Sequence, residues 1–145
     1  MKRGRRIAFD YGDTRIGVAM SDLSGMLASP FGTIAAQSDF VGEITALVAE
    51  YEPIYFAVGI PKHLSGNASA KMESVENFIS SLQENFDVPI IRIDERLSTV
   101  SAAKSLQASG KNAKESKGFI DAAAAATILD LAMAQEKFAE GSSSE

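Results

Sequence analysis

Short apolar runs and segments of helical periodicity follow one another along this chain. The first two apolar runs, at 7–9 and 16–20, are separated by a turn that contains Gly12 and Asp13. Two strand-like runs joined by such a turn predict a β-hairpin. A third run at 31–35 extends this hairpin into a three-stranded antiparallel meander.

The rest of the chain predicts helices that alternate with strands. Apolar residues three and four positions apart predict a helix that starts after Ser38 or Asp39 and stops at Pro53. Continuous apolar runs at 54–60 and 89–93 predict strands that are buried on both faces. The remaining expected segments are helices at about 69–86, 98–109 and 120–139, a lysine-rich mobile loop at 110–117, and a disordered tail at 141–145.

This order of elements predicts one α/β domain over residues 1–140. We expect a mixed five-stranded sheet with strand order 3-2-1-4-5 and helices on both faces. Strands 1 to 3 are antiparallel, and strands 1, 4 and 5 are parallel through right-handed crossovers. A chain of 145 residues is long enough to bury a core without disulfides or metals.

The composition restricts the location and the chemistry. The chain has no cysteine, which excludes a thiol nucleophile and is compatible with a reducing cytoplasm. No signal peptide is expected at the start, and the longest apolar stretch, 122–134, is shorter than the roughly 18 residues of a membrane span. We therefore expect a soluble, cytoplasmic protein with no membrane partner.

The net charge of −5 argues against bulk attraction to nucleic acid, so any such contact must be local. Basic residues do cluster at several places, which we read mainly as solvated surface. They are Lys2, Arg3, Arg5, Arg6, Lys62, His63, Arg92, Arg96, Lys111, Lys114 and Lys117.

Acidic residues follow two of the predicted parallel strands. Asp10 ends the first strand, and Asp94 and Glu95 end the fifth. In open α/β sheets, ligands bind outside the carboxyl ends of the parallel strands. The fourth strand, which lies between them, ends near Gly59, and the missing side chain there leaves a gap over which carboxylates can approach one another.

A third acid, Asp121, lies at the start of the last helix, before a run of alanines that lets this helix pack close to the sheet. Clustered carboxylates repel one another unless cations neutralise them. Oxygen ligands favour Mg²⁺ or Mn²⁺, and two such ions suit phosphodiester hydrolysis. Asp10 and Asp121 can also be explained by ordinary structural roles. Asp10 can cap the turn that follows it, and Asp121 can stabilise the dipole at the start of the last helix.

Four segments in order resemble the YqgF/RuvX family. They are the hairpin 10–19, the loop 59–61, the stretch 94–99 and the helix start 120–124. The resemblance implies an RNase H-like fold and a nuclease that processes the 5′ end of pre-16S ribosomal RNA or resolves Holliday junctions. It also implies that Asp10, Glu95 and Asp121 are the catalytic acids and metal ligands, with Asp94 as an extra ligand.

Three basic residues are candidates for substrate binding. Arg15 and Arg96 match basic positions of the family motifs, and Lys62 lies in the loop after Gly59. Arginine binds phosphate through two hydrogen bonds, although either arginine can instead pair with a neighbouring acid. Structured RNA is the expected partner, with branched DNA as the alternative, and resolvases act on junctions as homodimers.

Two other classes of function stay open at this point. The turn from Asp10 to Thr14 also resembles the phosphate-binding turn of sugar kinases and actin, but no second such turn or second domain follows. The other class is a non-catalytic nucleic-acid or ribosome-assembly factor that keeps the acids for structural reasons. Binding of Mn²⁺ that depends on Asp10 separates this class from a nuclease.

Overall fold

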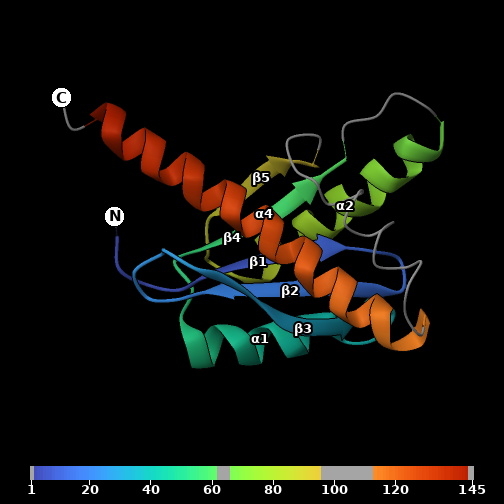
Figure 1. Ribbon diagram of the computed structural model, residues 1–145. Helices are drawn as coiled ribbons and strands as arrows, with labels where there is room; N and C mark the ends of the chain where they lie inside the picture. The colour runs from blue at the N-terminus through green and yellow to red at the C-terminus, as the bar shows by residue number, and fades with distance from the viewer. Residues whose placement is uncertain (1, 62–65, 96–112, 144–145) are drawn as a thin grey trace.

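The computed structural model describes residues 2–61, 66–95 and 113–143, and its five strands form one mixed sheet (Figure 1). The strand order is β3-β2-β1-β4-β5, which confirms the order predicted from the sequence. β1 pairs antiparallel with β2 and parallel with β4, and β4 pairs parallel with β5. The strands are β1 (Arg6–Tyr11), β2 (Arg15–Ser21), β3 (Ala28–Ala35), β4 (Tyr55–Ile60) and β5 (Ile90–Asp94).

β3 is longer than the sequence predicted, because it begins at Ala28 and not at Phe31. The prediction rested on the apolar run at 31–35 and left out residues 28–30. Proline is tolerated here because β3 lies at the edge of the sheet. The β2–β3 register shifts between Val18 and Ala19, which pair with Gly32 and Pro30, so Phe31 is an extra residue in a β-bulge.

Helix α1 (Phe40–Tyr51) has the ends that the sequence indicated. Asp39 caps its start by accepting a hydrogen bond of 3.0 Å from the backbone N–H of Gly42. Glu52 ends it in the left-handed conformation, with φ of 47°, directly before Pro53. The next helix, α2 (Gly66–Asn85), begins three residues earlier than we expected.

The last helix, α4 (Ala113–Ser143), is longer at both ends than the predicted helix over 120–139. The prediction of a loop over 110–117 was wrong for residues 113–117, which are helical. Alanine, lysine and glutamate are strong helix formers, so a segment with few apolar residues can extend a helix that is anchored elsewhere. Residues 141–143, which we had assigned to the tail, also continue the helix, and the helix expected at 98–109 lies outside the described residues.

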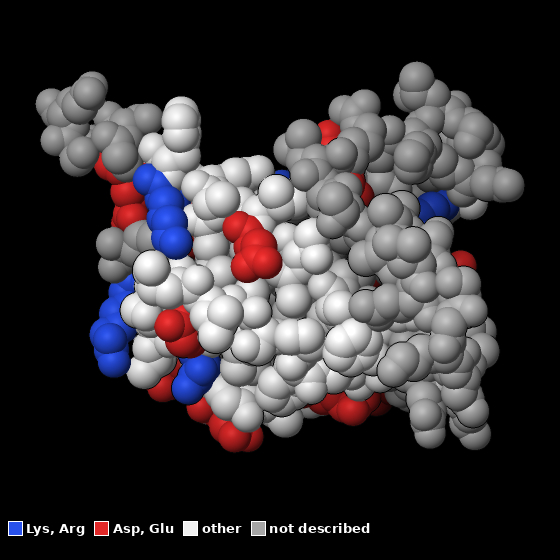
Figure 2. Space-filling view, viewed as in Figure 1, with Lys and Arg blue, Asp and Glu red and all other residues white. Residues whose placement is uncertain are grey.

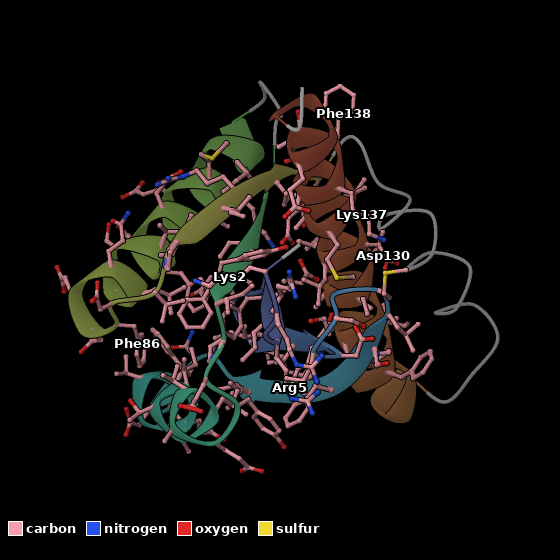
Figure 3. The ribbon with its side chains drawn as sticks, turned by 90° about the vertical axis from the view of Figure 1, so that its left-hand side faces the viewer. Lys2, Arg5, Phe86, Asp130, Lys137 and Phe138 are labelled. Atoms are coloured by element: carbon pink, nitrogen blue, oxygen red, sulfur yellow. The ribbon has the colours of Figure 1, made fainter. Side chains whose placement is uncertain are left out.

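Helices cover both faces of the sheet, as predicted, and the two faces differ in side-chain size. Figure 3 shows α1 and α2 on one side of the sheet and α4 on the other. The α1/α2 face carries large residues such as Phe9 and Phe56, whose rings contact each other at 5.3 Å between centroids. The α4 face carries alanines at positions 8, 19 and 57, which allow the alanine-rich helix to lie close to the strands.

Residues 118–140 of α4 are long and apolar enough to pass a length-and-composition test for a membrane span. Packing accounts for this apolar character, because α4 buries its apolar side against the sheet. The buried positions are Ala124, Ala125, Ile128, Leu129, Ala132 and Met133. Asp130, Lys137 and Phe138 project from the same helix away from the sheet (Figure 3).

An ion pair fastens the C-terminal part of α4 to the sheet. Arg6, which we had read as solvated surface, is fully buried, and it donates to Glu136 at 2.6 and 3.1 Å. The hydroxyl of Tyr55 donates to the same carboxylate at 3.0 Å. Burial alone would lower the pKa of Arg6, but the hydrogen bond and the charge of Glu136 outweigh it and raise the pKa. The guanidinium therefore stays charged inside the protein.

Candidate active site

Asp10 lies near the carboxyl end of β1 and is almost completely buried, with a relative exposure of 5%. Side chains alternate along a strand, so Asp10 faces the same side as Ala8, which packs under α4. Its position in the sheet is fixed by pairing with Gly17 on β2. On the other side, the pairing of Phe9 with Val58 makes Gly59 the neighbour of Asp10 in the parallel register of β4. A buried carboxylate thus stands between two glycines.

Gly17 allows α4 to approach Asp10. A Cβ atom at position 17 would overlap the backbone oxygen and carbonyl carbon of Asp121, and it would lie 3.1 Å from the Asp121 Cβ. The start of the buried part of α4 therefore rests directly on the backbone of β2. Since Gly17 is the partner of Asp10 in the sheet, Asp121 lies above a position about 4.8 Å from that of Asp10.

Gly59 has the same role on the other side of Asp10. A Cβ atom at position 59 would lie 2.9 Å from Oε1 of Glu95 and 2.6 Å from Cδ1 of Ile128. The Glu95 side chain therefore extends over β4 into the space that the glycine leaves. In this way two glycines, one on each neighbouring strand, bring Asp121 and Glu95 toward Asp10 on the α4 face.

Asp94 lies on the opposite face. Its neighbour Ile93 belongs to the core under α4, so alternation along β5 directs Asp94 toward α2. There it lines a separate cleft with Met72, Glu76 and Arg92. The structure thus separates Asp94 from the other three acids, although it is adjacent to Glu95 in the sequence.

Arg15 at the start of β2 pairs with one of the acids. Its Nε donates to Oδ2 of Asp121 at 3.0 Å, and the two side chains are 34% and 19% exposed. The turn before it holds Arg15 in place, because its backbone oxygen accepts from the N–H of Gly12 at 3.0 Å. A partly exposed guanidinium beside Asp121 provides a positive charge next to the acids.

The three acids fit a divalent cation by the chemistry of their oxygen ligands, and all three lie on the α4 side of the sheet. Carboxylate oxygens are the donors that Mg²⁺ and Mn²⁺ prefer, and the gaps at Gly17 and Gly59 bring Asp121 and Glu95 to the same face as Asp10. Within the residues that the structure describes, no three acidic or histidine side chains are arranged as a ready-made metal cluster. The Asp121 carboxylate is paired with Arg15 in this arrangement, so a cation would compete with the guanidinium for it.

Two of the predicted substrate-binding residues, Lys62 and Arg96, lie outside the described residues, as does His63. Gly59 was predicted from the sequence to leave a gap beside Asp10, whereas Gly17 was not. A glycine in a strand-like apolar run next to a candidate catalytic strand was the available signal, because glycine inside a strand often marks a close approach of another backbone.

Comparisons with known proteins agree with this architecture. A family model described as "RuvX: Holliday junction resolvase" matches residues 4–135. A protein of Streptomyces coelicolor named "Putative pre-16S rRNA nuclease" is 41% identical over 140 residues, which cover 94% of this chain and 84% of that protein. A protein of Mycolicibacterium smegmatis with the same name is 41% identical over 133 residues, covering 88% of this chain and 78% of that protein.

A solved structure supports the fold. T. thermophilus RuvC in complex with a Holliday junction substrate superposes with a TM-score of 0.57, covering 92% of this chain and 96% of that chain. The identity is 16%, so this likeness concerns the fold alone. The match of the family model over most of the chain, together with relatives about 40% identical, shows that this chain belongs to the RuvX family.

Proposed function

We propose that this chain is a metal-dependent endonuclease that cleaves phosphodiester bonds in structured RNA, at the 5′ end of pre-16S rRNA. The observation that carries the proposal is the pair of glycines that brings Glu95 and Asp121 to either side of the buried Asp10. The names of the relatives from Streptomyces coelicolor and Mycolicibacterium smegmatis support the choice of substrate.

In this proposal Asp10, Glu95 and Asp121 hold divalent cations, Mg²⁺ or Mn²⁺, as two ions. Bound ions of this kind lower the pKa of a water molecule and stabilise the leaving oxygen of the phosphodiester. Asp94 is left out of the set because it faces α2. The buried position of Asp10 keeps its carboxylate fixed by the sheet, which gives the site a rigid centre.

Arg15 neutralises Asp121 while no cation is present and contributes positive charge toward the substrate phosphate when a cation takes its place. Its partial exposure leaves the guanidinium accessible from solvent. Lys62 and Arg96 complete the proposed substrate-binding set. Arginine suits this role because its planar group donates two parallel hydrogen bonds to a phosphate.

A four-way DNA junction is the second candidate substrate. It is favoured by the description of the matching family model as a Holliday junction resolvase. Resolution requires two cuts, so this activity would need a homodimer, which light scattering with and without a junction would detect. A non-catalytic assembly factor is the third reading, and it predicts no Asp10-dependent binding of Mn²⁺ in isothermal titration.

The decisive experiment compares cleavage of precursor rRNA and of a four-way DNA junction side by side, with Mg²⁺ and with Mn²⁺. The test variant is Asp10→Asn, which removes the charge but keeps the shape, and we expect it to abolish cleavage with an unchanged circular dichroism spectrum. Asp39→Asn is the matched control, because asparagine caps a helix as well as aspartate does. Cleavage by Asp10→Asn at the wild-type rate would exclude the proposed site.

A further inference from the structure

A cleft lies directly beside the proposed active site, between the edge strand β3 and the start of the buried part of α4. Its volume is 480 Å³, which is within the range of small-ligand sites. Its walls are residues 30–33 of β3 and Gly118, Phe119 and Ala122 of α4. In Figure 2 the described surface where the lower part of α4 crosses β3 is white, with neither acidic nor basic side chains.

Two wall residues place the cleft near Asp121. Ala122, in its wall, follows Asp121 in the chain, and Thr33 pairs with Gly17, the residue on which Asp121 rests. Ile34 points into the core under α1, so alternation directs Thr33 to the α4 face. The cleft therefore lies near the proposed metal site, although none of the three acids is among its described wall residues.

Two glycines in the cleft wall are not explained by the protein itself. Among the residues that the structure describes, a Cβ atom at Gly32 or at Gly118 would meet no atom within 4 Å, and neither residue has a positive φ. This contrasts with Gly17 and Gly59, where a Cβ atom would collide with the site. Glycine inside a strand or a helix destabilises it relative to alanine, so neither packing nor backbone conformation accounts for these two. At Gly118 the missing side chain leaves room on the helix side of the cleft, whereas a Cβ atom at Gly32 would point to the α1 face together with Ile34.

The exposed aromatic side chain in the cleft suits a nucleobase. Phe119 is 58% exposed and lies two residues before the proposed catalytic Asp121 on α4. Bases of single-stranded nucleic acid stack on aromatic side chains without a strong sequence preference. Phe31 also borders the cleft, but its ring lies edge-on to Tyr51 of α1 at 5.8 Å, so Phe119 is the stacking group. Arg15, two residues from Gly17 on the same face, supplies a positive charge for the adjoining phosphate.

We propose that this cleft binds one unpaired nucleotide of the substrate strand next to the cleaved bond, with its base against Phe119. The proposal rests on the proposed nuclease function and makes it more specific, because a base inside a duplex is not available for stacking on a side chain. It predicts that the enzyme needs a single-stranded segment beside the cleavage site.

Binding measurements test this proposal without cleavage. The full-length chain carrying Asp10→Asn is titrated with two fluorescein-labelled RNA hairpins in a fluorescence anisotropy assay, one with a 5′ single-stranded overhang and one blunt. We expect Phe119→Ala to weaken binding of the overhang hairpin by about tenfold and to leave the blunt hairpin unchanged. Phe138→Ala is the matched control, because Phe138 is 78% exposed on the same helix but far along it from the cleft.

Gly118→Leu gives an independent test, since its Cβ atom meets no described atom within 4 Å and its side chain adds bulk at the cleft wall. We expect the melting temperature to stay the same or rise, because leucine is a better helix former than glycine, while binding of the overhang hairpin weakens. Unchanged overhang binding in Phe119→Ala, or an equal loss for both hairpins, would overturn the proposal.

The nuclease function and the nucleotide cleft fail in different ways. If the wild-type chain cleaves precursor rRNA and the Phe119→Ala variant binds the overhang as the wild type does, the cleft proposal alone is wrong. If overhang binding depends on Phe119 but the wild-type chain cleaves neither RNA nor a DNA junction with Mg²⁺ or Mn²⁺, the cleft proposal holds and the nuclease function fails.

Discussion

Replacement of Gly17 by alanine tests whether the close contact between β2 and α4 assembles the site. The added Cβ would overlap the backbone oxygen and carbonyl carbon of Asp121. Both atoms belong to the helix backbone, so rotation of a side chain cannot relieve the overlap. The start of α4 must shift, and Asp121 moves with it, away from Asp10.

The expected stability loss follows from the cost of overpacking. Extra atoms in a packed interior cost about 1–3 kcal/mol. Unfolding entropy scales with chain length, so each kcal/mol corresponds to about 3 °C in the melting temperature of a chain of this size. Gly17→Ala should therefore lower the melting temperature by about 3–10 °C. A displacement of about 1 Å at a catalytic group reduces the rate by about a hundredfold, and we expect a loss of at least that size in RNA cleavage.

Differential scanning calorimetry and a single-turnover cleavage assay measure the two effects. Gly32→Ala is the control for stability, because it adds the same methyl group to the same sheet where nothing lies within 4 Å. Its melting temperature should not fall. If Gly17→Ala has the melting temperature and the cleavage rate of the wild type, the argument that glycine packing positions Asp121 is refuted.

Four further substitutions have expected outcomes. Glu136→Ala leaves the buried Arg6 charge uncompensated and should lower the free energy of unfolding in urea by about 3 kcal/mol. Glu76→Ala breaks the exposed ion pair with Arg92 and should change the free energy of unfolding by less than about 1 kcal/mol. Equal losses in the Glu136 and Glu76 variants would contradict the distinction between a buried and an exposed ion pair. Arg15→Gln removes a cation that competes for an acid and should tighten Mn²⁺ binding in isothermal titration by up to about fivefold, whereas weaker binding would exclude such competition. Hydrogen bonds from the backbone N–H groups of Met26 and Leu27 lower the pKa of Asp22 from 3.8 to about 2, so its stabilising effect is complete above about pH 4 and is lost as the pH falls toward 2. Asp22→Asn should remove this part of the acid dependence in urea unfolding at pH 2–5, and an unaltered pH profile would show that the turn contributes nothing.

The RuvX membership could be recognised from four short motifs, and the strand order followed from local patterns. The turn at 12–13 and the positions of glycine and proline indicate where elements end, while the periodicity of apolar residues separates strands from helices. These signals depend on residues close together in the chain, and they placed β1, β2, β4, β5 and α1 within a few residues. Where such a signal was ambiguous, the prediction failed. Pro30 is inside an edge strand, and residues 113–117 extend α4 without apolar periodicity.

The composition of the site was less accessible from the sequence. The sequence motif offered both Glu95, as a catalytic acid, and Asp94, as an extra ligand, but alternation along β5 places them on different sides of the sheet. Arg6 and Arg5 form one basic cluster in the sequence, yet Arg6 is buried because Glu136, 130 residues away, lies against it. Contacts between residues so far apart in the sequence depend on how α4 packs on the sheet, which local patterns do not specify.

The sequence by itself determined that a buried strand ends on Asp10, that Gly59 leaves room beside it, and that further acids follow at 94–95 and 121. Only the tertiary structure decided which of these acids meet, because their approach depends on atoms from strands and a helix that are distant in the chain. Asp121 packs over Gly17 and Glu95 packs over Gly59, and these two contacts bring the acids to the α4 face beside Asp10. Local patterns specify elements, whereas a site on neighbouring strands requires the packing of those elements, in which a single missing Cβ sets how near two carboxylates can come.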